Sequence, residues 1–434
     1  MDLSIHRPFH RFAPAIIGAS LLLFIFIGGT FIGCSRAPLP AVKNALGGAS
    51  RNGYYPWQSK NLYHNKIIAA DSVKIAAGYS AQPLCIGAQQ YLVPTNAGGI
   101  VEIYNDSMGW YFGGLRAANT APNTPCDSSA CNALAMDSAG NCYATTQHSI
   151  FSLTSAGALR WRDSLGSYGD PTASLSPVLV LNSRVYCCSG DGDLDCFDLA
   201  GTLLWTKNIG HPMLSQVAGL ANGSIAVVYS RGDFHETDSL AVYDASGNLQ
   251  WMRETPGVRI IQGPIVTGEF NAEMILVAGA HDSADARKGV VCAFTPAGNA
   301  IYTSSVDLLP TGISADMEGN AYITGAALHS EDVQSVVVLV DKSGSERWGI
   351  IIDGIIGCPA AVTNKYVYFP VATNYVRVLY QLSHEGKTEE MEALPKIAFT
   401  PYAPIVDGLG RIILANKYGS QLFTYESDIA GKIF

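Results

Sequence analysis

The sequence predicts an all-β fold, an eight-bladed β-propeller made of four-stranded antiparallel blades. The first observation is a signature that recurs eight times, in which a polar residue is followed three positions later by Gly. The second is the content of each repeat, where short apolar runs alternate with residues that favour tight turns. Repeats of about 46 residues with four short strands each are typical of a closed ring whose blades pack on one another.

The signature is strongest in four repeats, where Trp follows four positions after the Gly. These pairs are Gly157 with Trp161, Gly201 with Trp205, Gly247 with Trp251, and Gly344 with Trp348. Weaker copies at Gly109, Gly298, Gly386 and Gly431 complete the series, with successive spacings of 48, 44, 46, 51, 46, 42 and 45 residues. We expect the polar residue and Gly to form a tight turn, and the Trp to cover the joint between neighbouring blades.

The third repeat illustrates the four strands. Apolar runs start at Pro177, Val185, Leu194 and Thr202, and turn residues separate them at 182–183, 191–192 and 198–201. A two-residue turn at 191–192 would place Cys187 opposite Cys196. Proline begins the first strand of five repeats, where a missing N–H is tolerated, at Pro83, Pro177, Pro264, Pro359 and Pro404.

Residues 1–34 have the features of an export signal. Arg7 and Arg11 precede an uncharged apolar run from Ala15 to Gly33, which Cys34 follows. The end of this run resembles the bacterial lipoprotein box, and the resemblance implies that Cys34 is lipidated and, with Ser35 after it, that the protein is sorted to the outer membrane. An uncleaved signal anchor is the alternative, since nineteen apolar residues can just span a bilayer.

Two further segments follow the leader. Residues 35–54 are small, polar and without periodicity, as expected for a flexible tether. Residues 55–434 are predicted to form one ring, in which the block from Trp57 to His64 packs across the closing seam and Gly431 to Phe434 forms the last strand. Truncating the last repeat should then damage the whole ring, because closure removes the free sheet edges.

The repeats resemble those of the pyrroloquinoline-quinone-like (PQQ-like) propeller proteins. The resemblance rests on the Asp/Thr-x-x-Gly-x-x-x-Trp units, the Pro-apolar first strands and the Trp block at the entry, and it covers residues 55–434. Together with the leader, it is most similar to the lipoproteins of the outer-membrane barrel-assembly machinery. This implies a non-catalytic scaffold, anchored by lipid, that binds an envelope protein partner.

The same repeat also builds quinone-dependent alcohol dehydrogenases, which carry a Glu-Asn-Asp calcium site and often a disulfide between adjacent cysteines. The chain has adjacent Cys187 and Cys188, but no counterpart of the calcium ligands is recognisable. We therefore predict no enzyme activity, no catalytic residue, no cofactor and no metal, and interpret the two cysteines as structural. A propeller that binds a small ligand or a glycan outside the cytoplasm remains an alternative.

Charge excludes one class of partner. The formal net charge is −9 and only 15% of the residues are charged, so the chain has no basic surface for nucleic acid. A monomer that recognises protein is the expectation.

Cysteines offer one candidate disulfide. Of ten cysteines, Cys126 and Cys131 lie five positions apart in a polar segment between the first two repeats, where they can close a small loop. The others after Cys34 fall in strands and are expected to be core residues. No spacing supports a zinc site.

Three consecutive repeats, the fourth to the sixth, share a long loop between their second and third strands. Each of these loops carries His with carboxylates, namely His235, Glu236 and Asp238; His281, Asp282 and Asp285; and His329, Glu331 and Asp332. Because these loops lie on one face of a propeller, they are candidates for a polar binding rim. The alternative is that they are polar only because they are exposed to water.

Overall fold

The computed structural model describes residues 54–55, 64–69 and 79–426, with gaps at 88, 106, 115–130, 147, 166–176, 190–191, 210–215, 230–237, 256, 269–271, 282–287, 329–332, 374–375, 395–401 and 418–420. All of these residues belong to one compact unit, Leu39–Phe434. Their regular structure consists of 33 β-strands. In this described part of the chain, no helix is long and apolar enough to cross a membrane.

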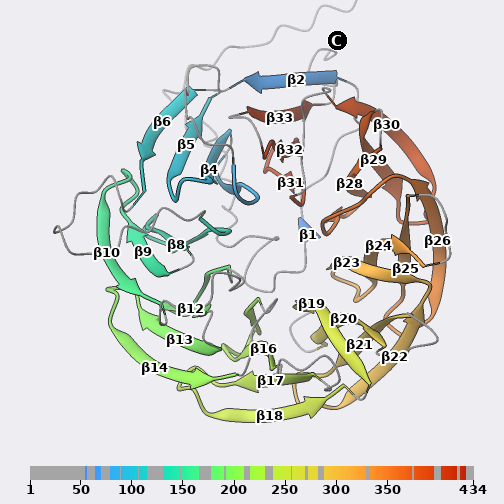
Figure 1. Cartoon of the computed structure of the whole chain (residues 1–434), viewed down its shortest axis with the longest axis horizontal. Helices are drawn as coiled ribbons and strands as arrows, with labels where there is room; N and C mark the ends of the chain where they lie inside the picture. The colour runs from blue at the N-terminus through green and yellow to red at the C-terminus, as the bar shows by residue number, and fades with distance from the viewer. Residues whose placement is uncertain are drawn as a thin grey trace, which may run out of the picture. The chain divides into compact units, whose positions relative to one another are not determined.

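The strands form eight sheets arranged as blades around a ring, so the predicted eight-bladed propeller is confirmed (Figure 1). In the first four blades the strands, from the inside outwards, are β3 (Leu84–Gly87), β4 (Gln90–Pro94), β5 (Ile100–Tyr104) and β6 (Ser107–Phe112); β7 (Ala135–Met136), β8 (Cys142–Thr145), β9 (Ser149–Leu153) and β10 (Leu159–Ser164); β11 (Leu179–Leu181), β12 (Arg184–Cys188), β13 (Asp193–Asp198) and β14 (Leu203–Asn208); and β15 (Ala218–Gly219), β16 (Ile225–Tyr229), β17 (Ser239–Tyr243) and β18 (Leu249–Glu254).

The second half of the ring repeats this order, with two strands added from the N-terminal part of the chain. The strands are β19 (Val258–Thr267), β20 (Met274–His281), β21 (Gly289–Phe294) and β22 (Ala300–Val306); β23 (Leu308–Ala315), β24 (Ala321–Ala327), β25 (Gln334–Val340) and β26 (Glu346–Asp353); β1 (Tyr54–Tyr55), β27 (Ala361–Thr363), β28 (Tyr366–Ala372), β29 (Arg377–Ser383) and β30 (Thr388–Leu394); and β31 (Ile405–Val406), β32 (Ile412–Ala415), β33 (Gln421–Glu426) and β2 (His64–Ala69).

The antiparallel order gives the ring two different faces. Leaving aside β1 and β2, which come from the N-terminal part of the chain, the turn from the first to the second strand of a blade and the turn from the third to the fourth lie on one face, which we call the turn face. The loop from the second to the third strand and the connection to the next blade lie on the opposite face, the loop face. The long loops predicted to form a polar rim therefore belong to the loop face.

The ring is closed by the two ends of the propeller chain. Strand β2 pairs antiparallel with β33, with His64 opposite Glu426 and Ile67 opposite Phe423, and lies at the outside of blade 8 (Figure 1). The fourth place of this blade is taken by β2, a strand from the N-terminal part of the chain. Residues 57–63 of the predicted seam block, like residues 431–434, lie outside the described residues.

Tryptophans join each blade to the next on the turn face. The indole Nε1 of each Trp donates to a main-chain carbonyl in the next blade's turn, with Trp161 bonding Leu199 at 3.0 Å, Trp205 bonding Ala245 at 3.1 Å, Trp251 bonding Pro296 at 2.7 Å and Trp348 bonding His384 at 2.9 Å. Trp110 bonds Ser155 in the same way. Each indole ring thus covers the joint between two blades, and its N–H group has a hydrogen-bond acceptor there.

The indole rings pack against the glycines of the repeated signature. A Cβ added at Gly201 would lie 2.5 Å from the ring of Trp161, and φ at this residue is +92°. Only Gly can adopt this positive φ without strain and also leave room for an indole ring at this distance. The first weak copy was placed wrongly, because Gly109 lies within β6 and the turn before it has its positive φ at Asn105.

We expect Gly201→Ala to lower the free energy of unfolding by about 2–3 kcal/mol, since the new methyl group clashes with Trp161 and the backbone is strained. Urea unfolding followed by tryptophan fluorescence measures this. Gly357→Ala is the matched control, since nothing lies within 4 Å of a Cβ there, and its stability should stay within about 0.5 kcal/mol of wild type. If the two substitutions lowered the free energy of unfolding equally, the contact between Gly201 and Trp161 would not be what stabilises the packing of these blades.

Candidate interaction face

The structure describes two of the predicted rim residues, and they lie on the loop face at blades 4 and 5. Asp238 is 4% exposed, its Oδ2 accepts the Ile260 N–H at 2.7 Å, and its carbonyl accepts the Thr255 N–H at 2.9 Å. In place of the predicted surface role, Asp238 therefore holds the connection between blades 4 and 5. His281 ends β20, with Nδ1 3.2 Å from the Gly257 carbonyl.

The other seven rim residues lie outside the described residues, so the structure does not bring them together. They are His235, Glu236, Asp282, Asp285, His329, Glu331 and Asp332. Cys34 and Cys126 also lie outside, so lipidation of Cys34 and the Cys126–Cys131 disulfide stay predictions.

Four exposed aliphatic side chains belong to segments near the loop face of blades 6 and 7, and we call this set the aliphatic patch. Ile351 projects from the side of blade 6 that faces away from blade 7, since its neighbours Ile350 and Ile352 pack in the joint between these two blades. Its members are Val333 (58% exposed), Ile351 (66%), Ile355 (57%) and Val376 (47%). Val333 directly follows the predicted rim loop that contains His329, Glu331 and Asp332. The sequence did not reveal this patch, because its four residues come from three separate segments.

Main-chain hydrogen bonds hold the patch residues in place. Gly354 N donates to the Val333 carbonyl at 2.8 Å, and Ile355 exchanges two bonds with Ala372 at 2.8 and 3.0 Å. Val376 closes a turn with Thr373, whose N–H donates to the Val376 carbonyl at 2.9 Å. Since the segments are fixed to one another, a partner would not have to order them on binding.

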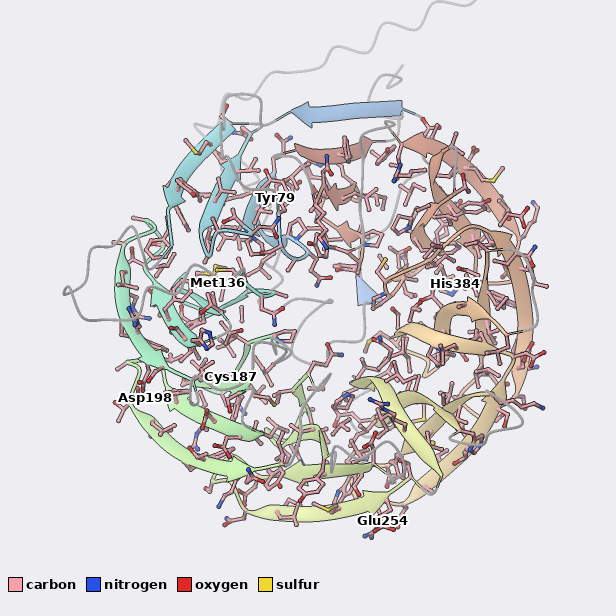
Figure 2. The ribbon with its side chains drawn as sticks, viewed as in Figure 1. Tyr79, Met136, Cys187, Asp198, Glu254 and His384 are labelled. Atoms are coloured by element: carbon pink, nitrogen blue, oxygen red, sulfur yellow. The ribbon has the colours of Figure 1, made fainter. Side chains whose placement is uncertain are left out.

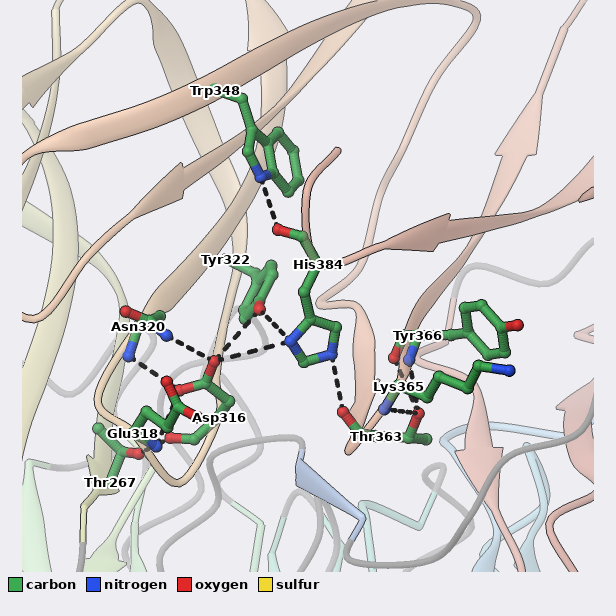
Figure 3. A network of polar contacts seen from close by, with 10 residues as sticks. All are labelled: Thr267, Asp316, Glu318, Asn320, Tyr322, Trp348, Thr363, Lys365, Tyr366 and His384. Atoms are coloured by element: carbon green, nitrogen blue, oxygen red, sulfur yellow. Dashed lines mark hydrogen bonds and ion pairs between the residues drawn. The ribbon is translucent and has the colours of Figure 1, made fainter. Parts of the chain in front are cut away.

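A polar network joins blades 6 and 7 on the opposite, turn face (Figure 3). The Tyr322 hydroxyl lies 3.2 Å from Asp316 Oδ2 and 3.0 Å from His384 Nδ1, and His384 Nε2 lies 2.9 Å from the Thr363 carbonyl. Nε2 must therefore donate to Thr363. The Asp–Tyr–His arrangement looks like a proton relay, but every member is occupied in linking two blades, so we assign it a structural role.

Asp316 belongs to a second type of turn, which the sequence analysis missed. Its Oδ1 accepts the N–H groups of Glu318 and Asn320, both at 3.0 Å. Equivalent turns start at Asp137 and Asp407. The signal was present as a second Asp-x-x-Gly series ending at Gly140, Gly319 and Gly410, all with positive φ.

The adjacent cysteines are buried in two different joints. Cys187, labelled in Figure 2, packs between blades 2 and 3. Cys188 and Cys196 pack between blades 3 and 4. The predicted register was wrong by one residue, because the turn extends from Ser189 to Asp193 and places Asp195 opposite Cys187. A shift of one residue moves side chains to the other face of a strand.

Asp195 is a buried carboxyl beside Cys187. Burial raises the pKa of Asp195 to about 6, with further increases from Asp193 and Asp163, against a hydrogen bond from Thr206 that lowers it. Thr206 Oγ1 donates to Asp195 Oδ1 at 2.7 Å. Keeping this carboxyl charged at neutral pH therefore costs stability.

The folded-state pKa of Asp195 lies above its unfolded value, so its favourable contribution is complete below about pH 4 and is lost as the pH rises through about 6. We expect Asp195→Asn to be more stable than wild type at pH 7.5 by about 2–3 kcal/mol, and equal to it near pH 4. Urea unfolding at both pH values measures this. Asp198→Asn is the control, and it should be less stable than wild type at pH 7.5, because backbone hydrogen bonds lower the pKa of Asp198 and favour its charged form in the folded state. A constant difference between wild type and Asp195→Asn across this pH range would contradict the assignment.

Comparison with known proteins gives a structural likeness only. No protein-family model and no curated protein matches the sequence. Among solved structures, BamB from Moraxella catarrhalis is similar with a TM-score of 0.58 at 14% identity, covering 85% of this chain and 98% of BamB. The fold is that of a PQQ-like propeller. The predicted resemblance to BamB is thereby confirmed at the level of the fold.

Solved structures of dehydrogenases with this fold are at least as similar by TM-score. The quinohemoprotein alcohol dehydrogenase from Comamonas testosteroni has a TM-score of 0.64 at 11% identity, covering 92% of this chain and 82% of its own. A europium-containing methanol dehydrogenase has a TM-score of 0.59 at 10% identity, covering 86% of this chain and 89% of its own. The fold by itself therefore does not decide between a scaffold and an enzyme.

The residues that suggested a quinone site do not fit one. Cys187 is fully buried and Cys188 is 3% exposed, and because they pack in different joints they cannot together cover a cofactor. Within the described ranges, no three His, Cys, Asp or Glu side chains gather closely enough to hold a metal ion. We derive no chemical step through a quinone or calcium.

Proposed function

We propose that the protein is a non-catalytic scaffold of the bacterial cell envelope, anchored by lipid on Cys34, that binds an envelope protein through its loop face. The observation that carries this proposal is the aliphatic patch. An exposed apolar group with polar neighbours is typical of a protein-binding surface. The Gln334–Asp353 hydrogen bond of 2.7 Å supplies such a polar edge between blade 6 strands.

The structural likeness to BamB and the lipoprotein-like leader together support one partner class. Both features are expected of a scaffold in outer-membrane barrel assembly, held at the membrane by its N-terminus and presenting a propeller to other subunits. The fold fits a quinone-dependent dehydrogenase equally well, but the separate burial of Cys187 and Cys188 favours the scaffold.

We expect affinity purification from crosslinked membranes to recover barrel-assembly subunits with the wild-type chain, and the double variant Ile351→Glu/Ile355→Glu to lose them by at least about tenfold. Quantitative mass spectrometry of the captured proteins measures this. Leu249→Glu is the matched control, because Leu249 is also about half exposed (50%) but lies on the outer strand of blade 4. Equal capture by the double variant would refute the patch as the binding surface.

Two further arms test the rest of the proposal. Radioactive palmitate should label the wild-type chain and not Cys34→Ala. A wild-type chain without label, or label that survives this substitution, would exclude a lipid anchor on Cys34. Purified protein mixed with pyrroloquinoline quinone and Ca²⁺ should show no bound absorbance. A stoichiometric bound quinone would overturn the non-catalytic assignment.

A further inference from the structure

A pocket of about 600 Å³ opens on the turn face over the joint between blades 5 and 6. This volume is within the range of sites that bind small ligands. Among the described residues, its apolar lining includes Met274, Ile301 and Met317, and its charged lining consists of Glu273, Glu318 and Lys342. The pocket lies on the face opposite the aliphatic patch, so it is a separate site.

The joint beneath the pocket differs from the five Trp joints. At the five Trp joints, the indole N–H donates to the residue that follows the turn's polar residue. Between blades 5 and 6, Tyr302 packs on Gly344 instead, and no hydrogen bond joins its hydroxyl to the equivalent carbonyl of Lys342. Ser304 Oγ bonds the Gly344 carbonyl at 2.5 Å in its place. The turn that carries Lys342 therefore lacks the indole contact found at those five joints.

Hydrogen bonds from neighbouring blades fix the residues that line the pocket. Glu318 N donates to Asp316 Oδ1 at 3.0 Å, and the Thr267 hydroxyl bonds the Asp316 carbonyl, so the Glu318 turn is tied to blade 5. Glu273 Oε1 accepts the N–H of Ala221 at 2.9 Å. The site is thus preorganised by contacts with blades 4 and 5.

The apolar groups form the floor and one side of the pocket. Met274 is 8% exposed, and a Cβ added at Gly319 would lie only 2.3 Å from its Cε, so this side chain fills the base of the joint. Met317 and Ile301 are 41% and 40% exposed and available for contact. Methionine adapts its shape to different apolar side chains, which suits a site for peptides.

The charges are separated along the blade radius. Glu273 and Glu318 lie in turns between first and second strands, near the ring centre, whereas Lys342 lies in a turn between third and fourth strands, further out (Figure 1). Across the described residues, the side chains of Glu318 and Lys342 make no ion pair. Burial raises the pKa of Glu273, so a bound cation would favour its charged form.

We propose that this pocket binds a short extended peptide segment of a partner protein, with Lys or Arg at the ring-centre end, an aliphatic or Met side chain in the middle, and Asp or Glu at the outer end. The inner carboxylates pair with the basic residue, the methionines and Ile301 cover the apolar one, and Lys342 pairs with the acidic one. This goes beyond the proposed function, because a second site on the other face lets the ring hold two segments at once.

The test uses a positional-scanning library of acetylated and amidated pentapeptides, measured by fluorescence polarisation against the full chain purified in detergent. We expect pools with a basic, an apolar and an acidic residue in adjacent positions to bind best. Glu318→Lys should weaken those pools by about fivefold and favour pools whose basic residue is replaced by Glu. Met317→Arg should weaken all pools by at least about tenfold, since its side chain projects into the pocket.

Ile351→Glu/Ile355→Glu is the control on the opposite face and should bind the pools as wild type does, which keeps this test independent of the patch. Thermal unfolding of each variant verifies that it is folded, and Met317 and Ile351 are exposed enough to tolerate change. Three results would each overturn the proposal: no pool that binds wild type below about 1 mM, equal binding to Met317→Arg, or a charge preference unchanged in Glu318→Lys.

Discussion

Replacing Arg411 with Met should lower the free energy of unfolding by about 3–5 kcal/mol, because it leaves a buried carboxylate without its cation. Arg411 is 3% exposed and Asp407 is fully buried. Arg411 Nη2 lies 2.6 Å from both Asp407 Oδ2 and the Tyr91 hydroxyl, and Arg411 Nε lies 2.6 Å from Asp407 Oδ2. Since Tyr91 belongs to blade 1, these contacts join the first and last blades.

A double-mutant cycle measures this coupling. Asp407→Asn keeps Oδ1 as acceptor for the N–H groups of Leu409 and Arg411, both at 2.9 Å, while it removes the charge. Arg411→Met combined with Asp407→Asn should therefore be more stable than the sum of the two single effects by at least about 1 kcal/mol. Tyr91→Phe, which removes one hydroxyl, should cost about 1 kcal/mol. Strict additivity in urea unfolding would show that the three groups do not act together.

Replacing residues 64–69 with a Gly-Ser linker of equal length should abolish cooperative unfolding of the ring. Without β2, blade 8 loses its outer strand and β33 exposes an unpaired edge beside Leu422, Phe423 and Tyr425, all buried in the intact ring. The loss is on the order of 5 kcal/mol, comparable with the stability of a whole domain. Differential scanning calorimetry should show a broad or absent transition.

The register of this seam allows a rescue. Because His64 lies opposite Glu426, the six residues of β2 can be appended after Glu426 through an Asn-Gly turn as a regular hairpin. We expect this chain, which also carries the Gly-Ser linker at 64–69, to recover a sharp transition. A chain that ends at Glu426 but keeps β2 is the matched control and should fold, since β2 holds the fourth place in blade 8. Failure of the rescue together with failure of this control would contradict closure by β2.

Much of the ring could be predicted from the sequence because the signals are local. Asp198 and Gly201 form a turn within four residues, and Trp161 docks on the next copy of that turn, so one periodic pattern describes both the hairpins and the joints. Where the local pattern erodes, prediction failed. Gly109 was assigned to a turn although it lies in β6, since the first blade turns at Asn105 without the signature.

The error of one residue in the predicted register of β12 and β13 had a different cause. The sequence predicted a two-residue turn at 191–192, whereas the observed hairpin closes between Ser189 and Asp193. The register decides whether Cys187 or Cys188 shares a joint with Cys196, because side chains alternate between the two faces of a strand. Only the pairing of β12 with β13 shows that Cys187 lies opposite Asp195.

The fold class, the number of blades and the residues of the Trp joints could be predicted from the sequence, since each depends on contacts that repeat at a fixed interval. The tertiary structure alone decided the closure by β2, the Arg411–Asp407–Tyr91 contact, the aliphatic patch and the pocket between blades 5 and 6. Each of these unites residues from different blades or from opposite ends of the chain. Such contacts leave no repeating pattern in the sequence, because ring closure brings together residues that are far apart along the chain.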